Sequence, residues 1–490
     1  MSWTQFYATS YKEIVKNIKK IQGIAVGFNT NLDAIIEFSG KKILELINKF
    51  KIDSFSLYKK IIEWKGRIVE PIDFITGLCG CFEKGKASEW LIDNQITYNY
   101  LIDNLPPPKS ISLGGQVGIM SDVLTNLGVS KVIIHTVTLS NTLKTKFNKS
   151  KNLVLPIYDK KNNLVFVHPK KAKGLDESLH LHIISEIKKG DTIKISDSMN
   201  WRCPRDNRFI ATFDPANTEL QIMKAFQDDI ELIAQQIDGL FLSGIHMLDP
   251  ITLKNEGVIE RITNILAIID RAKKSNPRLI VHLEACSTKN KYILEEFYKQ
   301  SMRNSYWDSI GCNERELVEI LRAIGEKQFS NELRKNFTQE KVITGCIKIC
   351  DKLKLQRFHL HQYGSYILVA KEDYLEIEQM KKSLCFASLV TAEKALLGKV
   401  SRNLDYNLLL NEIELDKNIA KSYFETVQAL SNLTNDSLEN IKQKGASKLS
   451  DYFIIIIPAI VIDNPIYTVG LGDTISSATL TAEISYKKGN

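Results

Sequence analysis

Short apolar runs alternate with amphipathic stretches along most of this chain, which is the pattern of an α/β protein. Runs rich in β-branched residues predict strands at residues 23–29, 131–137, 238–246, 278–285, 365–370 and 453–462. Several of these runs are apolar at every position, which indicates a parallel sheet covered by helices on both faces. The amphipathic stretches between them predict helices at residues 230–237, 259–274 and 373–397. We therefore expect an α/β fold with right-handed crossover connections.

Two segments depart from this alternation. Residues 37–113 are rich in helical patterns and end near the sequence LPPPK, whereas residues 153–210 open with an alternating run and a KKNN turn, which predicts a hairpin. We interpret both as insertions that build a smaller, discontinuous α/β lid domain. The large domain then comprises residues 1–36, 114–152 and 211–490, and the substrate lies in the cleft between the two domains.

Composition narrows the class of protein. The chain has 490 residues, of which 44% are hydrophobic, and its net charge of +8 is spread without a block of like charges, so we expect no nucleic-acid partner. The longest apolar run, residues 453–462, is too short to cross a membrane, and the N-terminal segment lacks the pattern of a signal peptide. The 8 cysteines lack the paired spacing of a zinc site. We expect a cytoplasmic protein with reduced thiols.

The sequence VGLGDTIS joins the last apolar run to a predicted helix. Gly470 and Gly472 allow close approach of the backbone, and the free N–H groups at the helix start can stabilise charge on a transferred phosphoryl group. Asp473 could accept the proton of an attacking hydroxyl. The alternative is a plain turn with an aspartate N-cap. Ile475 stands where a GxGxxG motif requires glycine, which argues against a dinucleotide fold.

A candidate metal site lies near the end of the 278–285 run. Alternation places His282 and Glu284 on one face of the predicted strand, and Asn313 and Glu316 lie one helical turn apart in GCNEREL. Two carboxylates at neighbouring strand ends could hold Mg²⁺, largely through water, against a diphosphate. For Glu316 the alternative is a capping box with Asn313.

Candidate sugar ligands follow the first predicted strand. The sequence GFNTNLDAII offers amide and carboxylate groups, and SLGGQVG opens an apolar helix with two glycines; a turn is the alternative in both cases. A substrate phosphate could bind to a group of basic residues, for which a solvated rim is the alternative. The group consists of Lys170, Lys171, Arg202, Arg205 and Arg208.

Taken in order, NTNLDA, GKASEW, GGQ, VHP, PRDNRFI, HLE, NERE, HQYG and GLGD span nearly the whole chain. This series resembles the archaeal ADP-dependent sugar kinases of the ribokinase superfamily, the ADP-dependent glucokinases and phosphofructokinases. The resemblance implies a ribokinase-like, three-layer α/β/α large domain with a smaller discontinuous lid domain.

The resemblance also implies a role for individual residues. Asp473 would be the catalytic base, with Gly470, Leu471 and Gly472 as the anion hole. Glu284, Glu316 and Asp473 would organise Mg²⁺. The sugar would meet Asn31, Asp33, Glu89, Gly114, Gly115, Gln116 and His168, and Lys170 and Arg205 would hold a sugar 6-phosphate. The nucleotide would be bordered by His361, Gln362, Ile462, Gly472 and Asn313.

The implied reaction is transfer of the β-phosphate of Mg-ADP to a sugar hydroxyl, with release of AMP. Glu89 matches the glutamate that favours glucose, whereas the basic residues favour fructose 6-phosphate, so we expect an enzyme that accepts both. Gln362 stands where the family pattern has threonine, which puts the adenine-side contact in question. Two alternatives stay open: an ATP-dependent ribokinase-type kinase, and a non-catalytic sugar- or nucleotide-binding protein. We expect a monomer.

Overall fold

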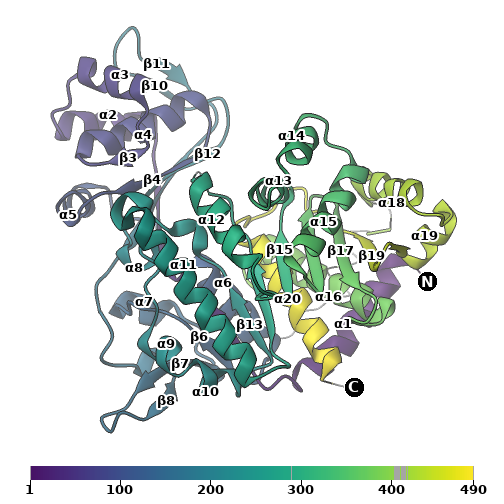
Figure 1. The fold of residues 1–490 in the computed structure, drawn as a ribbon. Helices are drawn as coiled ribbons and strands as arrows, with labels where there is room; N and C mark the ends of the chain where they lie inside the picture. Colours follow the sequence, from purple (N-terminus) through teal and green to yellow (C-terminus); the bar gives the residue numbers. More distant parts are fainter. Residues whose placement is uncertain (1, 289, 402–408, 410–414, 417, 489–490) are drawn as a thin grey trace.

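Two main β-sheets organise the chain (Figure 1). Each has its own hydrophobic core. The computed structural model describes residues 2–288, 290–401, 409, 415–416 and 418–488. Within these residues the larger sheet has eleven strands and the smaller has six, and a two-stranded ribbon accompanies the smaller one. We call the two parts the large-sheet unit and the small-sheet unit.

The large sheet is parallel in its middle and antiparallel at both ends. Its strand order is β18-β19-β17-β16-β15-β14-β13-β1-β6-β7-β8, and the strands from β16 to β7 are parallel. The bounds are β1 (Ile24–Gly27), β6 (Val132–Ile134), β7 (Leu153–Tyr158), β8 (Leu164–Val167), β13 (Gly239–Leu242), β14 (Ile280–Glu284), β15 (Ser309–Cys312), β16 (Arg357–Gln362), β17 (Ser365–Lys371), β18 (Ala446–Leu449) and β19 (Tyr452–Pro458).

All six predicted strands lie in this sheet, as β1, β6, β13, β14, β17 and β19. The prediction of parallel pairing is wrong for β17 and β19, which are antiparallel to their neighbours. Only Tyr363 and Gly364 separate β16 from β17, and so short a connection can form a hairpin but no crossover.

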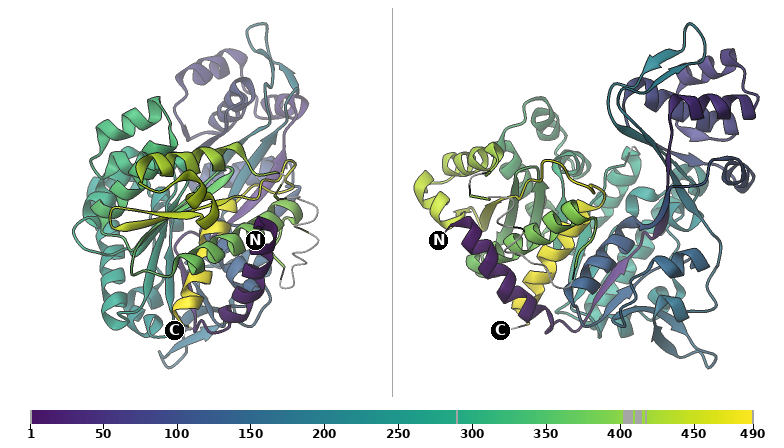
Figure 2. Two further views of the ribbon diagram at one scale, coloured as in Figure 1. Left: turned by 90° about the vertical axis from the view of Figure 1, so that its right-hand side faces the viewer. Right: turned by 180° about the vertical axis from the view of Figure 1, so that it is seen from behind.

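Helices cover both faces of the large sheet, giving three layers (Figures 1 and 2). One layer contains α6, α20, α16 and α1, each packed against the next, and the other runs through α10, α11, α12, α13, α15 and α18. The bounds are α1 (Trp3–Ile18), α6 (Gly115–Leu127), α10 (Ile230–Ala234), α11 (Pro250–Ser275), α12 (Lys291–Ser301), α13 (Glu314–Ala323), α15 (Gln339–Leu353), α16 (Ile377–Leu397), α18 (Lys421–Leu433) and α20 (Leu471–Lys487).

Shorter helices fill the connections of the large-sheet unit. They are α7 (Asn141–Lys146), η1 (Pro169–Lys171), α8 (Pro215–Thr218), α9 (Lys224–Asp228), η2 (Ile245–Met247), α14 (Lys327–Lys335) and α19 (Leu438–Lys444). In the described part of the chain, no helix combines the length and apolar character that a membrane crossing requires.

The small sheet has the order β3-β4-β12-β9-β2-β5, and the ribbon pairs β10 with β11. Its core includes several aromatic rings, and Phe209 contacts both Phe74 and Trp90. The bounds are β2 (Asn31–Glu37), β3 (Arg67–Ile68), β4 (Ser88–Ile92), β5 (Ser110–Gly114), β9 (Leu181–Ile187), β10 (Thr192–Lys194), β11 (Asn200–Arg202), β12 (Asn207–Thr212), α2 (Gly40–Lys49), α3 (Ser54–Glu63), α4 (Pro71–Lys84) and α5 (Gln95–Asn104).

The hairpin predicted near residue 153 exists, as β7 and β8, but it belongs to the large sheet. Leu153 pairs with Val132 of β6 and is fully buried there, so the assignment of residues 153–167 to the lid domain is wrong. The small sheet also takes in β2 from Asn31 and β12 to Thr212, which moves two of the predicted boundaries by a few residues.

The parallel strands end together at one edge of the large sheet. The segments that leave β1, β13, β14, β15 and β16, together with the start of α20, meet at this carboxyl edge. Open α/β sheets bind ligands at this edge.

Candidate active site

The start of α20 forms a tight turn at a glycine. Gly470 is the N-cap and has φ +67°, and a Cβ at this position would collide with Ile119. The Thr474 hydroxyl donates to the Gly470 carbonyl at 2.8 Å, which fixes the turn. The first N–H groups of a helix have no partner within it, so this end is suited to an anion.

Asp473 lies in the first turn of α20 and is half-buried. Burial raises its pKa to about 7, and the charge of Glu284 adds to the rise, whereas Lys394 and His361 oppose it. A carboxylate that titrates near neutral pH is matched to general-base work at that pH.

Lys394 was not predicted. It is buried in α16, and its Nζ donates to Thr474 Oγ1 at 3.1 Å, directly beside the glycine turn. A charged residue in the apolar stretch SLVTAEKALL is the signal that sequence reasoning could have used.

Glu284 ends β14 and is held by two imidazoles. His361 Nε2 lies 3.0 Å from its Oε1, and His282 Nε2 lies 3.3 Å from its Oε2. Burial favours the neutral acid, but the hydrogen bonds from His282 and His361 outweigh it and lower the pKa of Glu284 to about 2. Glu284 is therefore a fixed, ionised group at the carboxyl edge.

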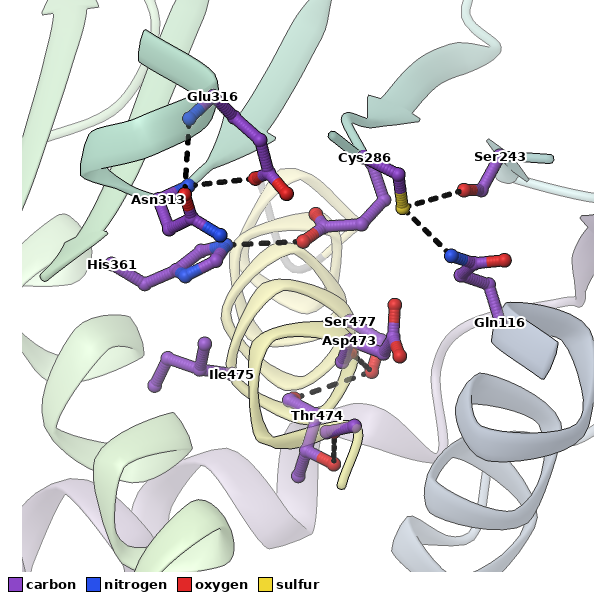
Figure 3. Close-up of polar contacts among 12 residues, drawn as sticks. Gln116, Ser243, Cys286, Asn313, Glu316, His361, Asp473, Thr474, Ile475 and Ser477 are labelled. Atoms are coloured by element: carbon purple, nitrogen blue, oxygen red, sulfur yellow. Dashed lines mark hydrogen bonds and ion pairs between the residues drawn. The ribbon is translucent and has the colours of Figure 1, made fainter. Parts of the chain in front are cut away.

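Glu316 and Asn313 form a capping box at the start of α13 (Figure 3). Glu316 Oε2 accepts from the Asn313 N–H at 2.9 Å, and Oε1 accepts from the Ser287 N–H at 3.2 Å. The capping alternative is thus correct, and it holds the carboxylate at the site. Burial raises the pKa of Glu316 to about 7.

The residues present fit a hard cation bound through water. The charge of Glu284 raises the pKa of both Glu316 and Asp473, and a cation would relieve this repulsion. Ser476 Oγ is buried without a hydrogen-bond partner, and a Cβ at Gly311 would touch both it and Glu284. Within the described residues, however, no three His, Cys, Asp or Glu side chains converge closely enough to bind an ion directly. Oxygen ligands with intervening water suit Mg²⁺.

A cavity of about 270 Å³ lies on one side of the α20 start, between the two units. Five of the predicted sugar ligands line it: Asn31, Asp33, Glu89, Gly115 and Gln116. The cavity also reaches Gly470 and Asp473, so a molecule bound there would meet the turn and its carboxylate.

Hydrogen bonds fix these ligands. Asn31 Nδ2 donates to Asp33 Oδ1 at 2.6 Å, and Glu89 accepts from the Thr212 hydroxyl at 2.9 Å. The Gln116 amide accepts from Asn29 at 2.9 Å and contacts Cys286 Sγ at 2.7 Å, as Figure 3 shows for the second contact.

Sequence reasoning missed two histidines in this cavity, His182 and His246. His182 Nε2 lies 3.1 Å from Asp214 Oδ2. Burial lowers the pKa of His182, but the hydrogen bond and charge of Asp214 outweigh burial, so the pKa is raised. His246 stands at the end of the predicted strand 238–246, a position that could have marked it as a candidate. Arg208, one of the basic group, also lines the cavity.

Four predicted sugar-site residues do not line the cavity. His168 Nε2 contacts the Asn148 carbonyl at 2.9 Å, and its Nδ1 accepts from the Lys170 N–H, so both residues belong to the η1 turn. This turn follows the β7–β8 hairpin at the far edge of the large sheet, which explains their placement. Arg205 donates from Nε to the Gly85 carbonyl. Gly114, also absent from the lining, is the N-cap of α6.

A second cavity, of about 370 Å³, lies on the other side of the α20 start. His361, Gln362, Ile462 and Gly472 line it, as predicted for a nucleotide site, and Asn313 does not. Apolar groups complete the walls, among them Tyr366, Ala392, Ala395, Ala459, Ile460 and Ile475. The Gln362 side chain is turned to Ser365 Oγ, to which it donates at 2.6 Å.

An ion pair between Arg67 and Asp249 links the two units. Arg67 of β3 donates to both carboxylate oxygens of Asp249, at 3.1 and 3.2 Å, and Asp249 is the N-cap of α11. Arg67 also pairs with Asp93 inside the small-sheet unit. Arg67 and Asp249 border a larger space, of about 850 Å³, between the units.

The three layers of the large-sheet unit, with both cavities at the carboxyl edge of its sheet, define a ribokinase-like fold. The conserved region of ADP-specific phosphofructokinases and glucokinases matches residues 22–482, and the chain belongs to this family.

Relatives of both kinds resemble it along the full length. The chain is 28% identical to an ADP-dependent glucose/glucosamine kinase of Pyrococcus abyssi, over 99% of both chains. It is 25% identical to an ADP-specific phosphofructokinase of Methanosarcina acetivorans, over 99% of this chain and 97% of the relative.

Two solved structures show the same fold. The last common ancestor of ADP-dependent phosphofructokinases from Methanosarcinales superposes with a TM-score of 0.82 at 29% identity, over 99% of this chain and 98% of that one. An ADP-dependent kinase in complex with fructose-6-phosphate and ADPβS gives a TM-score of 0.79 at 27% identity, with the same coverage.

Proposed function

We propose that this protein is an ADP-dependent sugar kinase, which transfers the β-phosphate of ADP to a sugar hydroxyl and releases AMP. One observation carries the proposal. The start of α20 stands between two cavities: Gly470 and Asp473 border the polar one, and Leu471 and Gly472 border the apolar one. A phosphoryl group passing from nucleotide to sugar would cross this turn.

Each residue of the turn then has a chemical task. Asp473 takes the proton of the attacking hydroxyl, and the first N–H groups of α20 stabilise the charge on the transferred group. Mg²⁺, when bound, would neutralise phosphate charge, and Glu284 and Glu316 would hold it through water. Lys394 supports the turn from behind through Thr474.

The lining of the polar cavity suits two kinds of sugar as the phosphoryl acceptor. Its carboxylates, Asp33 and Glu89, are suited to sugar hydroxyls, and Arg208 is suited to a sugar phosphate. The relatives include both a glucose/glucosamine kinase and a kinase bound to fructose-6-phosphate. We therefore assign both glucose and fructose 6-phosphate to this protein, with Arg208 in the phosphate role that was expected of Lys170 and Arg205.

The small-sheet unit would act as a lid. It contributes Asp33, Glu89 and Arg208 to the polar cavity, so its closure would complete the sugar site and exclude water. We also propose that the protein is a monomer and acts in the cytoplasm.

A donor and acceptor panel tests the proposal. The protein is incubated with Mg²⁺, with ADP or ATP as donor and with glucose or fructose 6-phosphate as acceptor, and both nucleotide and sugar products are quantified. We expect AMP and phosphorylated sugar in equal amounts from ADP with either acceptor. If phosphorylated sugar forms with ATP as donor but not with ADP, the ribokinase-type alternative is favoured. If nucleotide binds but no phosphorylated sugar forms, the non-catalytic alternative is favoured.

A further inference from the structure

A chain of buried polar side chains runs from the interior of the large-sheet unit to Glu284. Arg357 of β16 pairs with Glu483 of α20, Nε to Oε2 2.8 Å, and both side chains are 0% exposed. Arg357 Nη1 donates to Ser309 Oγ at 2.5 Å. Ser309 Oγ lies 2.8 Å from His282 Nδ1, and His282 Nε2 lies 3.3 Å from Glu284 Oε2.

Stability alone does not account for this row of hydrogen-bonded side chains. A buried ion pair contributes little net free energy, because the cost of desolvating two charges offsets their attraction. Apolar residues could fill the same space in the core. Arg357 and Glu483 therefore call for another explanation, and their connection to Glu284 supplies one.

The direction of every hydrogen bond in the chain follows from its donors. A guanidinium group can only donate, so the Ser309 oxygen accepts from Arg357. The Ser309 oxygen has a second lone pair, but the described residues offer its single hydroxyl proton no acceptor other than His282 Nδ1, so this nitrogen accepts it. The ring proton of His282 consequently lies on Nε2, where it faces Glu284.

The opposite tautomer of His282 is disfavoured at both ends. A proton on Nδ1 would leave the Ser309 hydroxyl proton without an acceptor. It would also set the lone pair of Nε2 against a lone pair of the ionised Glu284. With the Nε2 proton in place, His282 and His361 each donate to a different oxygen of Glu284 and fix the plane of its carboxylate.

We propose that Ser309 and Arg357 are positioning residues, which set the tautomer of His282 and thereby aim Glu284 at the reacting phosphates and their cation. Glu483 pairs with Arg357 and lies on α20, the helix that bears Asp473. The same hydrogen-bonded side chains therefore connect Glu284 to the helix that carries Asp473. The inference rests on the proposed function for the role of Glu284, but the tautomer itself does not.

Nuclear magnetic resonance tests the tautomer directly. The whole protein is labelled with ¹⁵N-histidine and kept free of metal and nucleotide, and two-bond ¹H–¹⁵N spectra identify the protonated nitrogen of each ring. The signal of His282 is assigned by its loss in His282→Gln. We expect a neutral ring with its proton on Nε2.

Ser309→Ala removes the group that sets the tautomer. We expect the Nε2–H signal of His282 to shift toward a mixture of forms. The control is Ser447→Ala, because Ser447 is a buried serine of the same sheet whose hydroxyl bonds Asp436, away from both cavities. The spectrum of His282 should be unchanged in this control.

Kinetics supply the second readout. Outer-shell partners of metal ligands typically account for about 10–100-fold in metal affinity or activity. We expect the half-saturating Mg²⁺ concentration to rise by about this factor in Ser309→Ala, while its melting temperature falls no further than that of Ser447→Ala.

The two readouts separate the possible failures. A proton on Nδ1, a doubly protonated ring, or a Ser309→Ala spectrum like that of the wild type would overturn the inference. So would a Mg²⁺ dependence equal to that of the control. If the wild-type protein has no kinase activity, the proposed function fails, and the spectra still decide whether the hydrogen-bond direction is correct.

Discussion

At the scale of single residues, the site depends on carboxylates whose surroundings differ. Two imidazoles keep Glu284 ionised, whereas burial raises the pKa of both Asp473 and Glu316 to about 7. In the proposed reaction, groups of one chemical type would thereby serve different roles: a fixed charge at Glu284 and a proton acceptor at Asp473.

Replacing Asp473 tests the assignment of the base. Asp473→Asn keeps the size of the side chain and removes its capacity to accept a proton, so we expect kcat to fall by about 10²–10⁴-fold. Initial rates with saturating ADP and sugar measure the change. Calorimetric binding of ADP should be preserved, and near-wild-type turnover would rule out Asp473 as the base.

The pKa of Asp473 also predicts a pH dependence. A base must be ionised to act, and the pKa of Asp473 is raised to about 7, so kcat/KM should increase as the pH rises through this value. Initial rates at low substrate between about pH 6 and pH 8 give the profile. A flat profile across this range would contradict the raised pKa in the free enzyme.

The sequence indicated which residue types form the site, but not all of their positions. Asp473, Glu284 and Glu89 lie in local motifs that can be recognised, and the structure places each at the carboxyl edge or in a cavity. Lys394 and His182 lie in no such motif, because their roles arise from contacts made across the fold. Lys170 was misplaced for the same reason: charge near a motif does not give position.

At the scale of the element, the start of α20 is the decisive structure. Its turn requires a positive φ at Gly470 and leaves no room there for a Cβ. The helix behind it is buried over most of its length, so the turn cannot shift without disturbing the core.

Two glycine substitutions distinguish a loss of activity at the turn from the general stability cost of placing alanine at a positive φ. Gly470→Ala should destabilise the protein by at least about 1 kcal/mol and strongly lower kcat, because the new methyl group would displace the N–H groups. Gly128, at φ +87° with open space around it, is the matched control. Gly128→Ala should show a similar left-handed penalty with unchanged kcat.

Melting temperature and kcat measured on both variants check this prediction. If Gly470→Ala retained the wild-type kcat, or if the control lost activity as well, the placement of the anion site at this turn would be wrong.

Hydrophobic patterning predicted the elements better than their pairing. All six strand predictions are confirmed, because buried strands of this sheet are apolar on both faces. The apolar pattern also predicted parallel pairing, which holds for β1, β6, β13 and β14 but is wrong for β17 and β19, because antiparallel strands can be buried on both faces as well. The hairpin at β7 and β8 was found from its turn, but a local turn does not reveal which sheet the hairpin joins.

At the scale of the whole molecule, the polar cavity draws on both units. Asp33, Glu89 and Arg208 come from the small sheet, and Gln116 and Asp473 come from the large-sheet unit. The order of motifs along the chain was sufficient to identify the family. It did not give the arrangement of the cavities, because these residues meet only after both units have folded.

The Arg67–Asp249 ion pair predicts a measurable effect on the relation between the units. Arg67→Met would remove a restraint of about 1 kcal/mol, which corresponds to roughly a five-fold change in an equilibrium between lid positions. We expect a larger radius of gyration in solution scattering of the free protein, and a higher KM for the sugar with a smaller change in kcat.

Arg271→Met is the matched control, because Arg271 pairs with Glu231 through two hydrogen bonds within the large-sheet unit. The control should leave both the scattering curve and KM unchanged. Equal effects of the two substitutions would show that the Arg67 pair does not restrain the lid.

The order of strands along the chain has a consequence for synthesis. Every strand of the small sheet lies between Asn31 and Thr212, whereas β1 of the large sheet pairs with β13, which begins only at Gly239. During translation the small sheet can therefore form first, while the N-terminal strand of the other sheet stays exposed without one of its neighbours. The last strand of that sheet ends at Pro458, so the apolar sheet stays incomplete until residues 452–458 have been synthesised.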